Sequence, residues 1–342
     1  MRLHALSRPL AFLPALALLL AFGLLGCAPQ VSMEVLEPAA AHGVTQLRRL
    51  AVVQFNNDEG GIATAAVEQA LSSFALGQQP YFTLVDAGIL KNYLDGQGVE
   101  MVFNTKELRK RNKGIGADGV VLGTVSRSSW RDERTTKKRS VCVEWSKNGS
   151  CRKYGSRDAP CTTRTGLFSF TPKVVDVNSG KIIFSQEFAE SDKEDFCRGT
   201  DDPQPSGISL VGNAREQAIQ RFLRVVAPHV VRVQVPLITA DDSGMDKPTR
   251  EAIAKGVDFA QAGRMDRACA AWSAAEASHP GGYALPYLRG VCAEQAGNLD
   301  LAETAYRQAD QRCDSPNAEI SNALERIGRA KANSRLLEQQ LN

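Results

Sequence analysis

The sequence predicts an α/β domain with a mixed sheet and packed helices, followed by an all-α domain of helical repeats. Over residues 47–238, short β-rich apolar runs alternate with runs whose apolar residues recur at helical spacing. Over residues 249–342, a pattern of small and large residues recurs at a fixed interval, as from Gly256 to Gly290. An apolar run typical of an export signal precedes both domains.

Residues 1–26 have the pattern of a secretory signal peptide, with Arg2 and Arg8 before an apolar run over residues 10–25. This run is too short and too near a cleavage site for a membrane span. It ends in Leu24-Leu25-Gly26-Cys27, which resembles the lipobox of bacterial lipoprotein precursors; an ordinary secretory signal with an incidental cysteine is the alternative. Acyl chains such as palmitate each contribute about 0.8 kcal/mol per buried CH₂. We therefore expect Cys27 to be lipidated and to attach the chain to a membrane.

The residues behind Cys27 indicate where the folded part is held. Cys27 is followed by Ala28 and not by an aspartate, which resembles the outer-membrane sorting signal of enteric lipoproteins. We therefore expect the protein to lie at the periplasmic face of the outer membrane. Residues 27–46 are small and show no core-forming period, and we expect them to form a flexible tether. Fully extended at about 3.3 Å per residue, this tether would reach roughly 60 Å.

The composition of the remainder is that of an ordinary globular protein of two domains. Without the two arginines of the signal, 39 basic residues (41 − 2) face 38 acidic ones, and we expect no nucleic-acid partner. His42, His229 and His279 are too few and too scattered for an obvious metal site or triad. We expect neither a metal nor a cofactor.

Seven cysteines remain besides Cys27, and outside the cytoplasm they favour disulfides. Their wide spacing lacks the close pairing of zinc ribbons, although zinc and free thiols remain alternatives. The first four cysteines permit three connectivities, among which the sequence does not choose. Because seven is odd, at least one thiol stays free unless it pairs between chains, and Cys313 is the candidate. The disulfide candidates are Cys142, Cys151, Cys161, Cys197, Cys269 and Cys292.

The α/β domain is expected to span residues 47–238. Its first elements are a strand at 50–55 with a turn at 56–61, a helix at 63–76, a strand at 81–85, helices at 86–94 and 106–113, and a buried strand at 119–125. Residues 171–177 and 181–188 then form a hairpin through Asn178-Ser179-Gly180, whose glycine can supply a positive φ. A helix at 211–227 and a last strand at 230–235 complete an order that predicts a mixed sheet.

Four segments of this domain resemble the periplasmic domain of the CsgG-like superfamily of curli-secretion lipoproteins. They are the opening strand with its Asn/Asp/Gly turn, residues 81–85, residues 116–123 (Gly-Ala-Asp-Gly-Val-Val-Leu-Gly) and the hairpin at 174–182. The resemblance is one of pattern over residues 48–236, and its relatives include non-channel lipoproteins of flagellar and peptidoglycan-synthase accessory systems. In the curli channel itself, two segments leave the sheet as membrane-spanning hairpins.

The corresponding two segments here depart from that pattern. The basic insertion, residues 127–164, contains eleven Lys/Arg, four Asp/Glu and three cysteines, and the acidic insertion, residues 189–209, is rich in aspartate and glutamate and contains Cys197. Strands that face lipid need about ten residues of alternating apolar character. We therefore expect no pore, and we expect the two insertions to pair as a disulfide-braced surface lobe.

After a linker at 239–248, residues 249–342 resemble two tetratricopeptide repeats with a capping helix at 319–340. Two repeats are fewer than the usual three, so we expect them to dock on the α/β domain, on a second copy or on a partner. A disulfide between Cys269 and Cys292 would support so small a core. The repeat-packing residues are Gly256, Phe259, Gly263, Ala268, Trp272, Ala275 and Pro280, with Gly290, Ala293, Gly297, Ala302, Tyr306 and Ala309 at the shifted positions.

The sequence offers no catalytic site. Gly114-Ile115-Gly116-Ala117-Asp118-Gly119 matches G-x-G-x-x-G, but it precedes a predicted strand instead of following one, so a nucleotide site is not expected. Asp58 and Glu59 are interpreted as solvated turn charges, with the lip of a binding cleft as the alternative. We expect the chain not to be an enzyme.

These observations predict a scaffold or adaptor of a cell-envelope assembly. The lipid on Cys27 would provide the membrane contact, and the repeats would bind a periplasmic or envelope protein, as such arrays do. Self-association into a homo-oligomer is compatible with the pattern. The alternatives are a subunit of a CsgG-type secretion channel and a cell-wall hydrolase, which is disfavoured because no nucleophile and base occur together.

Overall fold

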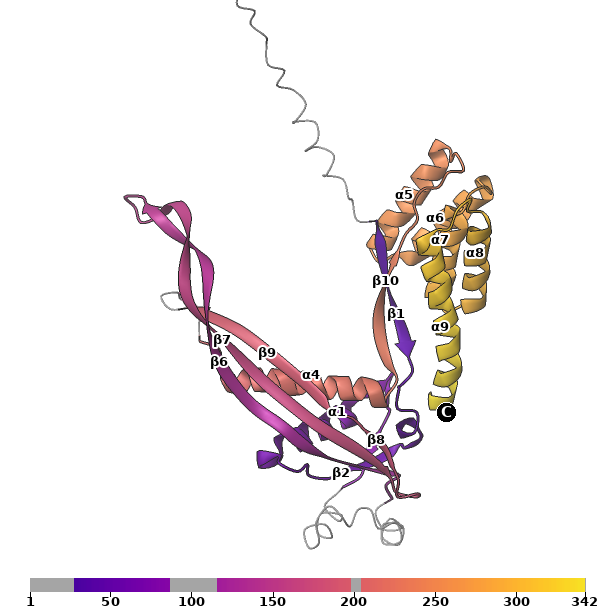
Figure 1. Ribbon diagram of the computed structural model, residues 1–342. Coiled ribbons are helices and arrows are strands. Elements are labelled where there is room, and N and C mark those ends of the chain that lie inside the picture. The colour runs from indigo at the N-terminus through magenta and orange to yellow at the C-terminus, as the bar shows by residue number, and fades with distance from the viewer. Residues whose placement is uncertain (1–27, 87–115, 198–203, 342) are drawn as a thin grey trace, which may run out of the picture. The chain divides into compact units, whose positions relative to one another are not determined.

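The structure is a computed structural model that describes residues 28–86, 116–197 and 204–341 (Figure 1). Cys27, the signal peptide and the helix expected at 106–113 lie outside the described residues, as does the helix expected at 86–94 beyond its first residue. The chain forms two compact units. The α/β unit comprises Leu36–His229 with Arg335–Asn342, and the helical unit comprises the chain up to Val35 with Val230–Ser334.

The α/β unit contains a mixed sheet, as predicted. The strands follow the order β5-β2-β6-β7-β8, and β9 also pairs with β7. β2 is parallel to β5 and β6, whereas β7 is antiparallel to each of its neighbours. The strand bounds are β2 Arg49–Val52, β5 Thr83–Leu84, β6 Gly119–Trp145, β7 Cys151–Asp176, β8 Ile182–Ser185 and β9 Phe188–Cys197, and a two-stranded sheet joins β3 Ala75–Leu76 to β4 Gln79–Pro80.

Two helices, α1 (Ile62–Ser73) and α4 (Gly207–Val226), cover one face of this sheet. Phe170 is fully buried there and contacts the rings of Phe188 and Phe222. The small residues of α4 that face the sheet, such as Ala214 and Ala218, let the helix approach closely. A second apolar layer lies on the opposite face and contains Ala51, Val120, Leu122 and Val175. Short 3₁₀ turns at Val44–Gln46 and Glu59–Gly61 precede β2 and α1.

The basic insertion does not leave the sheet but extends two of its strands. β6 and β7 stay paired from Gly119↔Asp176 to Trp145↔Cys151, far past the strand end expected at residue 125. The predicted hairpin is present, with Gly180 at a φ of 66°, but its second strand is only Ile182–Ser185. After it, the chain turns back to pair β9 with β7 from Phe170↔Phe188 to Cys161↔Cys197.

The interpretation of residues 27–46 as a flexible tether is wrong over Gln30–Glu37, which form strand β1. β1 pairs with β10 (His229–Pro236), the strand that the sequence analysis placed in the mixed sheet. Val31 and Met33 are buried while their neighbours are exposed, which is the period-two pattern of a half-buried strand. Alternation over so short a segment gave too weak a local signal, and the partner strand lies far along the chain.

The helical unit contains five helices in its described residues. They are α5 Lys247–Gln261, α6 Met265–Ser278, α7 Ala284–Gln295, α8 Leu299–Gln311 and α9 Ala318–Leu341, whose last residues belong to the α/β unit. Asp246 caps α5 by accepting a hydrogen bond from the Thr249 N–H, and Asn298 caps α8 through Leu301. One core joins these helices to the buried residues of β1 and β10. None of the helices in the described ranges is long and apolar enough to cross a bilayer.

Candidate functional site

Six cysteines form three disulfides, which settles the connectivity that the sequence left open. Cys142 is bonded to Cys151, Cys161 to Cys197, and Cys269 to Cys292. The second bond joins the basic insertion to the acidic one, as expected of a braced lobe. Cys313 is the free cysteine in the described part of the chain.

The base of the lobe is a three-stranded segment of β6, β7 and β9. Within it, the Arg164 side chain is hydrogen-bonded to residues of other segments of the same chain. Arg164 is 8% exposed, and its guanidinium donates two hydrogen bonds to Asp132 and one to the Pro205 carbonyl. It also lies 4.5 Å above the Trp130 ring. The hydrogen bonds from Arg164 lower the pKa of Asp132, outweighing the smaller opposite effect of its partial desolvation. Gly166 lies beneath α4, where any Cβ would collide with the Leu210 backbone.

Past the end of β9, the lobe continues as a two-stranded distal ribbon, residues 136–160. The ribbon contains seven Lys/Arg and two Asp/Glu, and none of its residues is buried. A two-stranded hairpin without an apolar face is marginal in water, so the cross-link between Cys142 and Cys151 supplies an order that packing cannot. The steps from Thr136 to Trp145, at about 3.3 Å each, place the tip roughly 30 Å beyond the last pair of β9.

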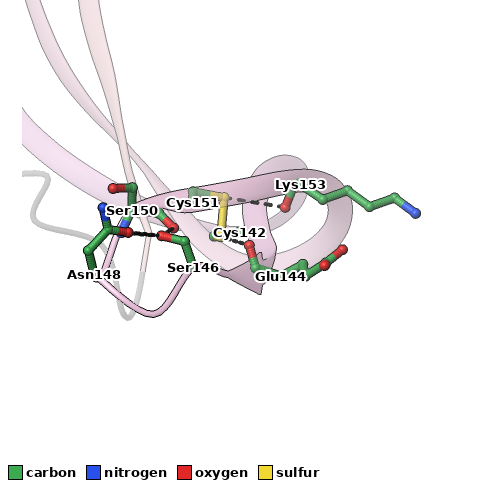
Figure 2. Close-up of a disulfide and its surroundings, with 7 residues drawn as sticks. All are labelled: Cys142, Glu144, Ser146, Asn148, Ser150, Cys151 and Lys153. Carbon is green, nitrogen blue, oxygen red and sulfur yellow. Dashed lines mark hydrogen bonds between the residues drawn. A yellow bond between two sulfur atoms is a disulfide. The ribbon is translucent and has the colours of Figure 1, made fainter.

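Figure 2 shows the tip, where the disulfide lies beside a compact turn. The Ser146 N–H donates to the Ser150 carbonyl, and the Ser146 hydroxyl donates to the Asn148 side chain. Gly149, with a φ of 83°, supplies the left-handed position that closes the turn. Three large side chains around this turn point into solvent: Val143 is 57% exposed, Trp145 65% and Tyr154 68%.

Two glycines of the repeat pattern lie against aromatic rings in the helical unit. Gly256 lies against the Trp272 ring, and Gly290, at the same position of the second repeat, lies against the Tyr306 ring, which is the counterpart of Trp272. In both places a Cβ would overlap the aromatic ring, so only glycine lets the two helices approach this closely. The alanines of the pattern at positions 268, 275, 293, 302 and 309 are buried, whereas Phe259 is partly buried and Pro280 is exposed.

The two remaining glycines of the pattern end helices. Gly263 follows α5 with a φ of 74°, and Gly297 follows α7 with a φ of 75°. Nothing lies within 4 Å of a Cβ at either position, so these glycines are needed for the left-handed backbone and not for close packing.

The face of α7 that a partner peptide would need is already covered within the helical unit. Most of the α7 side chains are buried, including Leu285, Tyr287 and Leu288. The Tyr287 hydroxyl donates to the Pro236 carbonyl at the end of β10, and the Ala284 N–H donates to Asp241. The array therefore docks on its own β1–β10 ribbon and on α9, and α7 offers no open groove.

A buried ion pair joins the last three helices. Arg326 of α9 donates two hydrogen bonds, of 2.6 and 2.8 Å, to the Glu294 carboxylate of α7, and the Tyr306 hydroxyl of α8 donates to the same carboxylate at 2.7 Å. Desolvation, aided by Glu294, raises the pKa of Tyr306, so the hydroxyl keeps the proton that it donates. Truncating Glu294 would strand a buried guanidinium, which makes this cluster structural.

Asp58 is neither a solvated turn charge nor the lip of a cleft. Its carboxylate is almost completely buried and accepts hydrogen bonds from the N–H groups of Ala63 and Thr64 and from the Thr64 hydroxyl. Asp58 thus caps the start of α1, whereas Glu59 is exposed. The capping role was missed because the helix begins a full turn after the aspartate, behind the two left-handed residues Gly60 and Gly61.

Neither a family model nor a curated protein matches this chain. Among solved structures, lipoprotein GNA1162 from Neisseria meningitidis is similar at 13% identity, over 51% of this chain and 97% of that one, with a TM-score of 0.28. The PelC dodecamer from Paraburkholderia phytofirmans is similar at 14% identity, over 57% of this chain and 98% of that one, with a TM-score of 0.27. At such TM-scores the likeness carries no argument, so the proposals below depend on this chain's own residues.

Proposed function

We propose that this chain is a non-catalytic scaffold of the bacterial envelope, held at the periplasmic face of the outer membrane by a lipid on Cys27. The pairing of six cysteines into three disulfides is the observation that carries this proposal. Disulfides persist in oxidising compartments and are rare in the cytoplasm. They therefore agree with the export signal and lipobox at residues 1–27.

The helical unit is the part that we assign to partner binding, as an array of the tetratricopeptide class. The repeated contacts of Gly256 with Trp272 and of Gly290 with Tyr306 support this assignment. Arrays of this kind act as rigid surfaces for proteins and rarely catalyse reactions. Because α7 is covered by the chain itself, we place the partner on the exposed sides of α5 and α8, where Leu301 is 48% exposed.

The attachment is tested by fractionating cells that express the wild type or Cys27→Ala. The wild type should sediment with the outer membrane and resist carbonate extraction, and Cys27→Ala should remain folded and be released by carbonate or high salt. Carbonate-resistant membrane association of Cys27→Ala would show that another segment anchors the chain.

The adaptor role is tested by photo-crosslinking in intact cells, with a photoreactive amino acid in place of Lys255 on α5 or Leu301 on α8. Lys181, an exposed residue of the α/β unit, is the matched control. Discrete adducts of one size from the first two positions, absent from the control, are expected. No adduct at either helix, or the same adducts at all three positions, would contradict the proposal. Release of products from peptidoglycan by the purified chain would contradict the non-catalytic role.

A further inference from the structure

The distal ribbon carries features that neither its folding nor the proposed function requires. Its tip presents Trp145, Tyr154 and Val143 to solvent, and exposed apolar side chains that lie close together indicate a contact surface, whereas single ones do not. Three exposed cations, Lys147, Arg152 and Lys153, lie within the same turn and its flanking strands, together with one exposed carboxylate, Glu144, opposite Lys153. Apolar rings and positive charges therefore occur together at the outermost point of the α/β unit's longest hairpin (Figure 1).

The described carboxylates of the acidic insertion, those of β9, lie far from the tip. Asp195 of β9 pairs with Lys137 and Thr163, at the base of the distal ribbon. From the Thr163 pair to Lys153 the strand advances about ten residues, or roughly 33 Å. This distance is several times the Debye length of about 8 Å at physiological salt, so the charges of β9 are screened from the tip. Three cations against Glu144 leave residues 142–154 with a net charge of +2 (3 − 1).

We propose that the tip of the distal ribbon docks on the surface of an anionic phospholipid bilayer. Tryptophan and tyrosine favour the headgroup region of a bilayer, where the ring is sheltered and the polar group stays hydrated. Lysine and arginine beside them reach the lipid phosphates, and each contributes to binding near an anionic surface. The end of β6, the turn and the start of β7 together carry both kinds of side chain.

The shape of the tip favours a bilayer over an acidic polymer. None of residues 136–160 is buried, so the ribbon does not enclose a ligand, and the exposed rings would add nothing to a contact made by charge alone. A bilayer, in contrast, offers a flat surface with an apolar interior. The protruding end of a ribbon can place its exposed rings in that surface while the cations beside them contact the headgroups. The charges also keep the strands themselves out of the hydrocarbon, because arginine and lysine are costly there.

The test uses the mature full-length chain with Cys27→Ala, so that no acyl chain contributes to binding. Its partition is measured by sedimentation with vesicles of phosphatidylcholine alone or with about 30% phosphatidylglycerol, a fraction chosen to give a surface potential of the kind that attracts basic segments. Binding should require phosphatidylglycerol and weaken at high salt. The triple variant Lys147→Gln, Arg152→Gln, Lys153→Gln should bind about 100-fold more weakly, since each cation is worth roughly fivefold.

A matched triple variant, Lys181→Gln, Lys193→Gln, Arg224→Gln, removes the same charge from exposed positions elsewhere in the α/β unit and should bind like the parent. The emission of Trp145 should shift to the blue on vesicles, and this shift should disappear in Trp145→Phe. Non-reducing electrophoresis confirms that Cys142 and Cys151 stay bonded in each variant.

Three outcomes would overturn the proposal. The first is equal loss of binding in both triple variants, which would reduce the effect to net charge. The second is equal binding to vesicles without phosphatidylglycerol. The third is preferential binding to a soluble anionic polysaccharide with no dependence on Trp145, which would assign the tip to a glycan. None of these outcomes depends on lipidation or on the helical unit, so the proposed function is judged separately.

Discussion

Replacing one glycine of the helical unit by alanine provides a direct measurement of the repeat packing. A Cβ at Gly290 would lie 2.5 Å from the Tyr306 ring, and a Cβ at Gly256 would lie closer still to Trp272. Both rings are fully buried and cannot swing aside. Gly328 of α9 is the control, because a Cβ there meets nothing within 4 Å.

The expected magnitudes follow from two opposing effects. Alanine in place of glycine in a helix interior stabilises by about 1 kcal/mol. Overpacking against a buried ring costs about 3 kcal/mol, the upper part of the range for well-packed cores. The free energy of unfolding should therefore fall by about 2 kcal/mol in Gly256→Ala and in Gly290→Ala, and rise by about 1 kcal/mol in Gly328→Ala.

The assay is urea unfolding of the purified mature chain, followed by far-ultraviolet circular dichroism, with thermal melts in parallel. At about 4–8 °C per kcal/mol for a unit of this size, the two packing variants should melt roughly 10 °C below the parent. Similar losses at the two positions would support a shared packing geometry. If Gly256→Ala is as stable as Gly328→Ala, the helices are not held at the distance that the structure gives.

Three further predictions concern the α/β unit. The double variant Cys161→Ser, Cys197→Ser should lower the free energy of unfolding by about 4 kcal/mol, and Cys142→Ser, Cys151→Ser by about 3 kcal/mol, because the first bond closes 36 residues and the second 9. The urea midpoints of the two variants are compared, and a larger effect of the shorter loop would refute the loop-entropy account. Gln340→Ala should lower the free energy of unfolding by about 2–4 kcal/mol, because the buried Gln340 amide is hydrogen-bonded to both the N–H and the carbonyl of Ala39. Gln339→Ala, at an exposed position, should be neutral. Equal urea midpoints for the two variants would show that the Gln340 amide is not needed. Asp132→Asn should destabilise at pH 7, because a carboxyl whose pKa is lowered on folding contributes stability above its unfolded pKa of about 3.9. This contribution is lost as pH falls through the folded value, so the gap between parent and variant should narrow as the pH is lowered below about 4; a gap that stays constant across the acid range would exclude the Arg164 ion pair as its origin.

The elements that the sequence predicted are those whose signal is local. The helical pattern around Val67 and Leu71 predicted α1, and the Asn178-Ser179-Gly180 turn predicted the hairpin that follows β7. The recurrence of small and large residues at one fixed interval indicated that helices approach closely at these positions, and the structure adds which glycine lies against which ring. Each of these signals either lies within a short stretch of chain or repeats at a constant spacing.

The elements that were missed depend on distant parts of the chain. β1 needs β10 as a partner, and its own alternation around Val31 and Met33 is too short to stand out. The buried Gln340 was not identified because its partners, Ala39 and His42, lie near the opposite end of the sequence. The charges of the basic insertion indicated a surface segment correctly, but they concealed that it continues the strands of the sheet.

The positions of the disulfides in the lobe explain how one segment can be both exposed and ordered. Near the sheet, Phe168 and Phe170 anchor β7 in the core, and no cross-link is needed there. Cys161 and Cys197 are joined where β9 ends and the last neighbouring strand is lost, and Cys142 and Cys151 are joined where the ribbon reaches its tip. Each bond thus stands where the ribbon loses a neighbouring strand or reaches its end, so reduction should release the ribbon from its tip inward while the sheet stays folded. A stiff ribbon keeps the charges of its tip about 30 Å beyond the last pair of β9. A reduced and collapsed ribbon would not hold them at that distance. If the tip docks on anionic lipid, the oxidising compartment that forms these bonds is therefore a condition for that contact.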